Sequence, residues 1–185
     1  MRKNYHGLEI ARLIDNHRVK RFAEVGVMRG RFAKRVLRQI GVTLHEYWGI
    51  DQWLELHSDK KAGRDHGHLG YPRRTQATWD EYYFGVCKLM TFFPCLHVLK
   101  AKSLEATDLF EDGYFDMVYI DTSHFYEDTL VEVPAWLPKV RPGGIISGHD
   151  YLTPTRKHAG VKKAIDELFP DGVNTLPDMV WWRHV

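Results

Sequence analysis

The 185-residue chain has few cysteines, no long apolar run and little net charge of either sign. Its two cysteines, Cys87 and Cys95, form no Cys-x-x-Cys pair, so we expect two reduced, buried thiols rather than a disulfide or a metal site. No apolar stretch is long enough to cross a bilayer, and no apolar segment follows the basic N-terminus. These absences predict a cytoplasmic protein with no membrane contact.

The formal net charge is only +2, which argues against nucleic acid as a partner. Basic residues do cluster at 18–21 and 29–31, around the first predicted turn. We interpret them as a solvated surface in preference to a phosphate-binding stripe. The sequence shows no repeat and no low-complexity tract, and its length suits one domain over residues 1–185. Nothing in the composition indicates an oligomeric state.

The chain is organised around residues 22–30, which read as a strand, a tight turn and the start of a helix. Gly26 and Gly30 permit φ > 0 and let a ligand approach the backbone closely. Glycines at such a turn also occur in α/β proteins with no ligand, so the context decides. The Gly-x-Gly-x-x-Gly fingerprint is absent, which argues against the alternative of a nicotinamide-dependent dehydrogenase.

Strand and helix patterns alternate along the chain after a leading helix within residues 1–20. This alternation predicts an α/β fold with a doubly wound parallel sheet and helices on both faces. Pro134 is expected to interrupt or kink its helix, and 141–144 reads as a turn. The predicted strands are 22–27, 47–51, 97–100, 115–121 and 145–150; the helices are 31–40, 75–93, 104–110, 126–137 and 161–169; and 172–176 and 179–185 can pair as a hairpin.

Residues 52–74 break the alternation with a polar, glycine-containing stretch. A loop of this length inside a compact domain predicts a lid or a wall of the substrate site. Its histidines have no recognised zinc spacing, so we do not expect them to bind metal. The aromatic residues of the helix that follows, 75–93, are expected to belong to the core.

Polar residues follow most of the predicted strands. Gly26, Asp51, Ser103, Asp121, His149 and Asp150 all fall at the carboxyl edge of the sheet, where ligands of such folds bind. Asp51 is placed to accept hydrogen bonds from the two hydroxyls of a ribose. Aspartate also follows strands simply because it favours turns, and for Asp51 alone the two interpretations are equal.

The later motifs resemble a known family. Phe115 to Asp121 with His124, Tyr126 and Glu127, then Leu137 to Gly144, then Gly148 to Tyr151 are similar to the class I S-adenosylmethionine-dependent methyltransferases, in the small branch called methyltransferase family 24. The resemblance implies a Rossmann-like, mostly parallel seven-stranded sheet with an antiparallel last strand. It also implies S-adenosylmethionine as cofactor and transfer of its methyl group to a small-molecule substrate.

The resemblance assigns roles residue by residue. Glu24 and Gly26 would line the methionine side, Gly30 would support the helix approach, and Asp51 would bind the ribose. Lys102 and Ser103 would lie near the adenine, although an acid or a small polar residue is more usual at the position of Lys102. Asp121 would lie next to the reacting sulfonium. Residues 52–74 would define an acceptor whose identity the sequence does not give.

Methyl transfer to an oxygen requires an in-line nucleophile and removal of its proton. His149 is the first candidate for the base and His124 the second, because imidazole titrates near neutrality; either could instead only bond a neighbouring backbone group. By the same resemblance, Asp121, His149 and Asp150 could hold a divalent metal ion, and a histidine in the set suits a transition metal better than Mg²⁺. The alternative outside catalysis is a cofactor-binding or scaffolding protein of the same fold.

Overall fold

A computed structural model describes residues 6–55, 74–151 and 159–185. Most of the predicted lid, residues 56–73, lies outside the described residues. The strands form one seven-stranded sheet in the order β3-β2-β1-β4-β5-β7-β6. They are β1 Arg21–Val25, β2 Glu46–Asp51, β3 Leu96–Lys100, β4 Phe115–Ile120, β5 Val140–Gly148, β6 Asn174–Leu176 and β7 Val180–His184.

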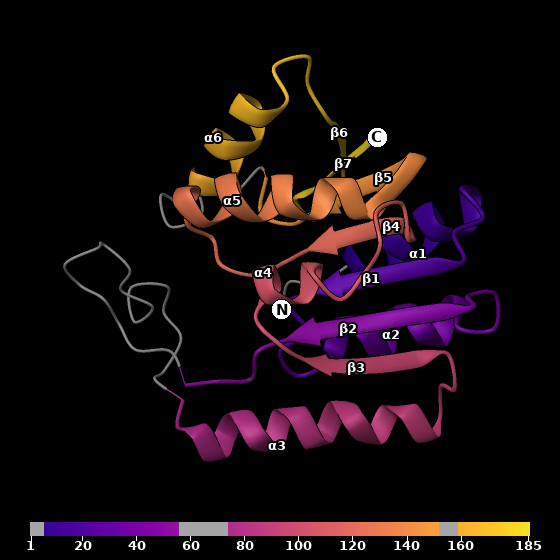
Figure 1. Ribbon diagram of the computed structural model, residues 1–185. Helices are drawn as coiled ribbons and strands as arrows, with labels where there is room; N and C mark the ends of the chain where they lie inside the picture. The colour runs from indigo at the N-terminus through magenta and orange to yellow at the C-terminus, as the bar shows by residue number, and fades with distance from the viewer. Residues whose placement is uncertain (1–5, 56–73, 152–158) are drawn as a thin grey trace.

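The first five strands are parallel to one another, whereas β7 runs antiparallel to both β5 and β6. Helices cover both faces of this sheet (Figure 1). They are α1 His6–Asn16, α2 Arg31–Ile40, α3 Gln76–Cys87, α4 Ser103–Thr107, α5 Tyr126–Trp136 and α6 Ala159–Leu168, with short 3-10 turns at Lys88–Thr91 and Leu137–Lys139. The predicted doubly wound sheet, with its antiparallel last strand, is confirmed.

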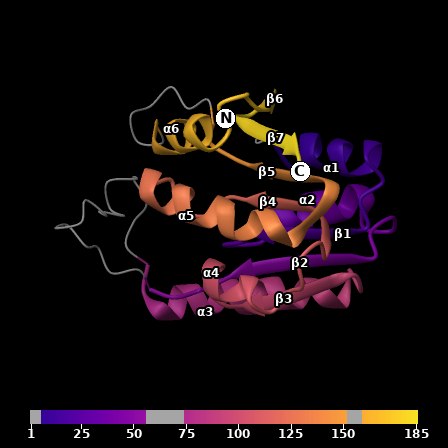
Figure 2. The same cartoon turned by 45° about the horizontal axis from the view of Figure 1, so that its top comes forward.

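Two apolar cores lie on opposite faces of the sheet. Phe22 and Met117 point toward α1 and α2, while Ala23 and Val118 point toward α4, α5 and α6. Figures 1 and 2 show the same division, with α4, α5 and α6 on one side of the strands and α1 and α2 on the other. This alternation follows from the two-residue period of a strand, and it fixes the register of the central strands.

The amphipathic pattern after the glycine turn folds as predicted. Helix α2 spans Arg31–Ile40 and buries one stripe, while its arginines and lysine lie off that stripe. Burying each large apolar side chain stabilises the fold by about 1.5–3 kcal/mol. The buried stripe consists of Phe32, Ala33, Val36, Leu37 and Ile40. Packing therefore fixes where α2 begins, and with it the geometry of the turn before it.

One local prediction was wrong, and of the expected interruption or kink at Pro134 the interruption is absent. The segment 141–144, predicted as a turn, belongs to β5, because Gly143 N donates to Val185 O (2.8 Å) and Val185 N donates to Gly144 O (3.1 Å). These bonds pair the segment with the chain end, and the ladder between β4 and β5 shifts register near Phe115 and Met117. Pro134 lies inside α5, which is continuous from Tyr126 to Trp136.

Helix α3 also differs from expectation. It lies along the β3 edge of the sheet (Figure 1), and Val86 is its one fully buried side chain. Trp79, Tyr82 and Tyr83 are half-buried around Val27 and Trp53 rather than enclosed in a main core. Within the described residues, none of the helices has the length and apolar character that a bilayer crossing demands.

Candidate active site

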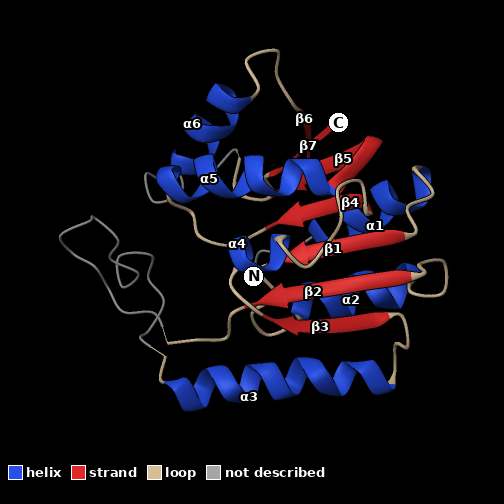
Figure 3. Ribbon diagram, in the orientation of Figure 1, coloured by secondary structure: helices blue, strands red, loops and turns tan. Residues whose placement is uncertain are grey.

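Four neighbouring strands end together at one edge of the sheet. Figure 3 shows the arrowheads of β1 to β4 pointing to the same end of the molecule. Gly26 N donates to Ile50 O (2.8 Å), Asp121 N to Val25 O (2.8 Å) and His149 N to Ile120 O (3.2 Å). Asp51, Gly26, Asp121 and His149 therefore follow one another across this edge, in the order β2, β1, β4 and β5.

The turn between β1 and α2 is tight. Gly26 has φ +100°, and a Cβ there would lie 2.1 Å from the carbonyl oxygen of Asp121. Met28 and Gly30 also have positive φ, at 51° and 67°. A Cβ on Gly30 would come within 2.9 Å of Val86 on α3. Both predicted glycines are thus required by backbone conformation and close packing, and neither places a side chain at the edge.

Asp51 holds this turn in place. Its Oδ2 accepts from Met28 N (2.8 Å) and its Oδ1 from Trp53 N (3.0 Å). Burial raises the pKa of Asp51, and the backbone N–H groups oppose that rise. The N–H groups of Val27 and Gln52 act on the same carboxylate, so the backbone engages it on all sides and its contact with ribose hydroxyls stays a prediction. Trp53 was missed by the sequence reasoning: its side chain is fully buried, and its Nε1 donates to Met28 O (2.8 Å).

Glu24 lies two residues inside the edge and is only 1% exposed. Its Oε2 accepts a hydrogen bond of 2.6 Å from the Tyr47 hydroxyl, and burial raises its pKa well above the usual range. The hydroxyl of Tyr119, also fully buried, has no hydrogen-bond partner among the described residues. Glu24 thus lies beneath the turn, and its contact with the methionine side of a cofactor stays a prediction.

Lys102 and Ser103 lie beside the β2 end, because Ala101 N donates to Asp51 O (3.0 Å). The Lys102 ammonium is exposed and contacts Glu105 Oε1 at 2.9 Å. Ser103 Oγ accepts from Trp136 Nε1 (3.0 Å), which ties this turn to α5. The adenine contact of these residues stays a prediction, and the Lys102 side chain is engaged by its own helix.

At the other side of the edge, two carboxylates and an imidazole converge. Ligand atoms of Asp121, His124 and Asp150 all lie within 4.8 Å of one another. His124 Nδ1 is 2.6 Å from Asp150 Oδ2, and His149 Nδ1 is 3.4 Å from the same atom and 3.9 Å from Asp121 Oδ1. The compact group therefore contains His124, where the sequence interpretation had placed His149.

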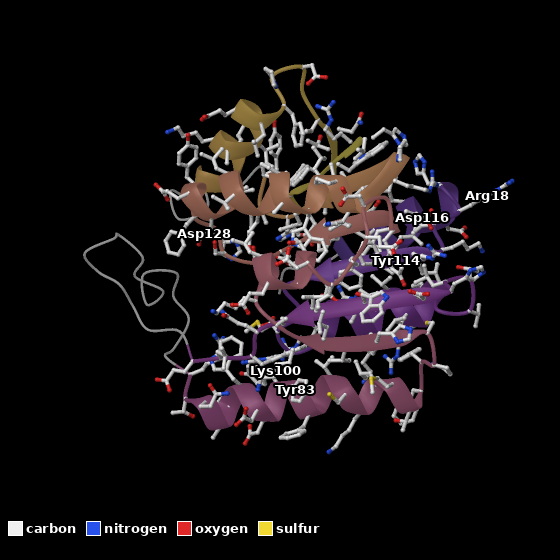
Figure 4. All side chains as sticks on the ribbon, viewed as in Figure 1. Arg18, Tyr83, Lys100, Tyr114, Asp116 and Asp128 are labelled. Carbon is white, nitrogen blue, oxygen red and sulfur yellow. The ribbon has the colours of Figure 1, made fainter. Side chains whose placement is uncertain are left out.

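The loop that carries His124 is fixed by hydrogen bonds to α5. Thr122 Oγ1 donates to Glu132, and Ser123 Oγ donates to Asp128 Oδ2 at 2.6 Å. Figure 4 labels Asp128 at the end of the molecule where the central strands terminate. The loop after β4 is therefore folded back over the edge, which brings His124 to Asp150. Nothing in the spacing of the sequence indicates this return.

The cluster perturbs the pKa of Asp150 and of both histidines. Burial lowers the pKa of His149, but the charge of Asp121 and the bond to Asp150 outweigh it and raise the pKa to about 9. The pKa of His124 is raised against burial, chiefly by its bond to Asp150. Burial opposes ionisation of Asp150, yet the two imidazoles hold its pKa far below the usual range. At neutral pH the His149 imidazole is protonated and lies beside the buried Asp150 carboxylate.

A small cavity adjoins these side chains. It measures about 20 Å³, and its lining includes Asp121, Ser123, His124, His149 and Asp150. A space of roughly 10–15 Å³ is enough for one water-sized group. The cluster therefore borders room for a water or for an ion of similar size.

The strand order, with acids at the carboxyl edge around a glycine turn, defines a class I, Rossmann-like methyltransferase fold. The chain belongs to methyltransferase family 24: the model of this family, described as a methyltransferase domain, matches residues 23–151.

Solved structures share the whole fold. A putative caffeoyl-CoA O-methyltransferase from Staphylococcus aureus has a TM-score of 0.66 and 14% identity, over 98% of this chain and 83% of that one. The O-methyltransferase TomG from Streptomyces achromogenes, in complex with SAM, has a TM-score of 0.64 and 12% identity, over 100% and 81%. SAH-bound PaMTH1 from Podospora anserina has a TM-score of 0.65 and 16% identity, over 100% and 80%.

A curated relative, "Uncharacterized protein y4gI" from Sinorhizobium fredii, is 34% identical over 61 residues. The match spans 33% of this chain and 6% of the length of that protein.

Proposed function

We propose that this protein transfers the methyl group of S-adenosylmethionine to an oxygen of a small polar acceptor. The observation that carries the proposal is the common edge at which β2, β1, β4 and β5 bring together Asp51, the Gly26 turn, Asp121 and Asp150. It is supported by membership of methyltransferase family 24 and by folds shared with SAM- and SAH-bound proteins.

Each part of the edge has a proposed role in binding. The carboxylate of Asp51 accepts the ribose hydroxyls, and the backbone at Lys102 and Ser103 borders the adenine. Gly26 and Gly30 let the cofactor approach the turn, with Glu24 beneath it. Asp121 lies at the sulfonium end, beside the cluster of histidines, where the acceptor oxygen is held in line with the methyl group.

The test of cofactor binding compares two aspartates with similar structural duties. Asp116 accepts hydrogen bonds from two backbone N–H groups, those of Lys20 and Arg21 (both 2.8 Å), much as Asp51 does. It lies near the start of β4, at the end of the sheet away from the carboxyl edge (Figure 4). We expect Asp51→Ala to weaken S-adenosylmethionine binding at least about 100-fold, because bonds to a charged acceptor contribute about 1.5–3 kcal/mol each. Isothermal titration calorimetry measures this affinity.

Asp116→Ala is the control for general loss of stability. It should lower the melting temperature and leave cofactor affinity within about twofold of the parent. Equal affinity losses in the two variants would show that Asp51 acts only on the fold. Cofactor binding without formation of S-adenosylhomocysteine from any hydroxylated acceptor would favour a noncatalytic binding protein.

A divalent ion fits the cluster by its donor chemistry. Two carboxylates and an imidazole within 4.8 Å suit a transition metal such as Mn²⁺ or Zn²⁺. Asp121, His124 and Asp150 would hold it, and His124 would have to release the proton it shares with Asp150. When bound, such an ion lowers the pKa of a coordinated hydroxyl.

His149, beside the group, is the candidate base and His124 the second, and Asp121 orients the His149 imidazole.

Chelation separates the metal-assisted from the metal-free reaction. If the ion is required, exhaustive EDTA treatment should lower kcat at least about 100-fold, and added Mn²⁺ should restore it. Undiminished activity would dispose of the metal. The metal-free reaction with His149 as base predicts kcat/KM rising with pH until about 9, because the imidazole accepts a proton only after losing its own.

A further inference from the structure

A cluster of cations and aromatic rings lies next to the glycine turn and has no part in the reaction described so far. The Arg29 guanidinium carbon is 4.7 Å from the centre of the Tyr82 ring. The guanidinium carbon of Arg74 is 5.9 Å from the same ring and 5.4 Å from that of Trp79. Two arginines from separate segments therefore converge on a single tyrosine of α3.

This cluster is joined to the cofactor turn by direct contacts. Arg29 follows Met28, whose N–H binds Asp51 and whose carbonyl binds Trp53. Tyr82 and Trp79 pack against Trp53 and Val27. Helix α3 begins at the end of the molecule where the central strands terminate (Figure 3). The cluster thus borders the site proposed for methyl transfer.

The charge of Arg29 lies in this cluster beside that of Arg74. Within residues 6–55, 74–151 and 159–185, no carboxylate forms an ion pair with Arg29. Lys100, the last residue of β3, lies over the Tyr83 ring of α3 (Figure 4) and is instead paired with Asp80 at 3.5 Å. Burial opposes ionisation of the Tyr82 phenol, but hydrogen bonds from Arg74 and Arg29 and their positive charges lower its pKa.

The Arg29 guanidinium has more donors than one phenol can accept, and Arg74 places a second guanidinium beside it. Each has five N–H donors in a planar fork that matches a carboxylate or a phosphate. Arg29 is exposed and Arg74 is half-buried, so an anion from solvent can reach the pair. We infer that Arg29, Arg74 and Tyr82 form a subsite for an anionic group, a carboxylate or a phosphate, carried by the methyl acceptor. This assignment rests on the proposed function, because it presumes an acceptor at the same edge.

The test measures anion binding without turnover. Inorganic phosphate and benzoate are titrated by calorimetry into the protein saturated with S-adenosylhomocysteine, which carries its own carboxylate and occupies the cofactor site. We expect Arg29→Gln and Arg74→Gln each to weaken binding of the preferred anion at least about tenfold. Arg38→Gln, on the exposed side of α2, is the matched control and should leave it unchanged. Whichever of the two probes binds more tightly identifies the class of anion.

A second readout reports from the site itself. A bound anion offsets the two positive charges, so the pKa of Tyr82 should rise and tyrosinate absorbance at alkaline pH should fall. This change should be absent in Tyr82→Phe. Anion affinity equal in the parent and Arg29→Gln would overturn the inference. So would loss of S-adenosylhomocysteine affinity in Arg29→Gln, since the arginine would then serve the cofactor. Titrations repeated without cofactor keep the result independent of whether the protein methylates anything.

Discussion

Gly26→Ala should destabilise the protein more than any other single substitution of a glycine in the turn. The new Cβ would lie 2.1 Å from the carbonyl oxygen of Asp121, and φ is +100°. Neither the backbone of β4 nor that of β1 can move without breaking the bond from Asp121 N to Val25 O. We expect a loss of about 4 kcal/mol or more in the free energy of unfolding, in the range reserved for severe steric conflict. Urea denaturation measures it.

Gly172→Ala separates the cost of the positive φ from the cost of the steric conflict with Asp121. Gly172 has nearly the same backbone conformation, with φ +93°, but nothing lies within 4 Å of its Cβ position. It should therefore show only the conformational cost, about 1–2 kcal/mol. If both variants lost the same amount, the contact between Gly26 and Asp121 would contribute nothing. Failure of Gly26→Ala to accumulate as folded protein, with Gly172→Ala folded, agrees with the expectation.

The sequence was most informative where one local signal decides the structure. The apolar stripe from Phe32 to Ile40 predicted α2, and polar residues at strand ends predicted one common edge. The terminal hairpin was also predicted, and β6 and β7 do pair. Amphipathic period and strand alternation are local properties, so a single sequence contains them.

Features decided by distant contacts could not be predicted in this way. Segment 141–144 has the composition of a turn, but pairing with Val185 extends it. His124 reaches Asp150 only because the loop after β4 folds back. The aromatic face of α3 lies beside the sheet edge, where it can be only half-buried. Whether Glu24 approaches a cofactor or only bonds Tyr47 depends equally on tertiary packing.

Asp150→Asn should have a large effect on stability and a specific effect on its pH dependence. The carboxylate is 5% exposed and lies 2.6 Å from His124 Nδ1 and 3.4 Å from His149 Nδ1. Removing its charge takes away one of the two carboxylates that favour protonated His149 and leaves the buried His124 without its bonded carboxylate. We expect the free energy of unfolding to fall by about 3 kcal/mol at pH 7 in metal-free protein. Asparagine tolerates the φ of +61° at this position, so the change is electrostatic.

The pH profile distinguishes this cause from a packing defect. In the parent, the His149 pKa is raised from 6.5 to about 9, so its stabilising contribution is complete below about 6.5 and disappears as pH rises through about 9. Because the pKa of Asp150 is lower in the folded than in the unfolded protein, its carboxylate adds stability at every pH above the unfolded pKa. This contribution is lost only in acid, far from the range in which His149 titrates. Stability of the parent should therefore decline between pH 6.5 and 9.

In Asp150→Asn, that decline should be reduced, because His149 then keeps only the charge of Asp121 to raise its pKa and titrates closer to its unfolded value. Denaturation at a series of pH values, with EDTA present, measures the slope, and NMR titration of the histidine resonances measures the pKa of His149 directly. Asp166→Asn is the matched control: this aspartate pairs with Lys162 on the exposed face of α6, where such an interaction contributes less than about 1 kcal/mol. Asp150 stabilises the fold through its charge only if Asp150→Asn alters the slope of the free energy of unfolding between pH 6.5 and 9 while Asp166→Asn leaves that slope unchanged. A common slope in all three proteins would mean that His149 and His124 are neutral in the folded state.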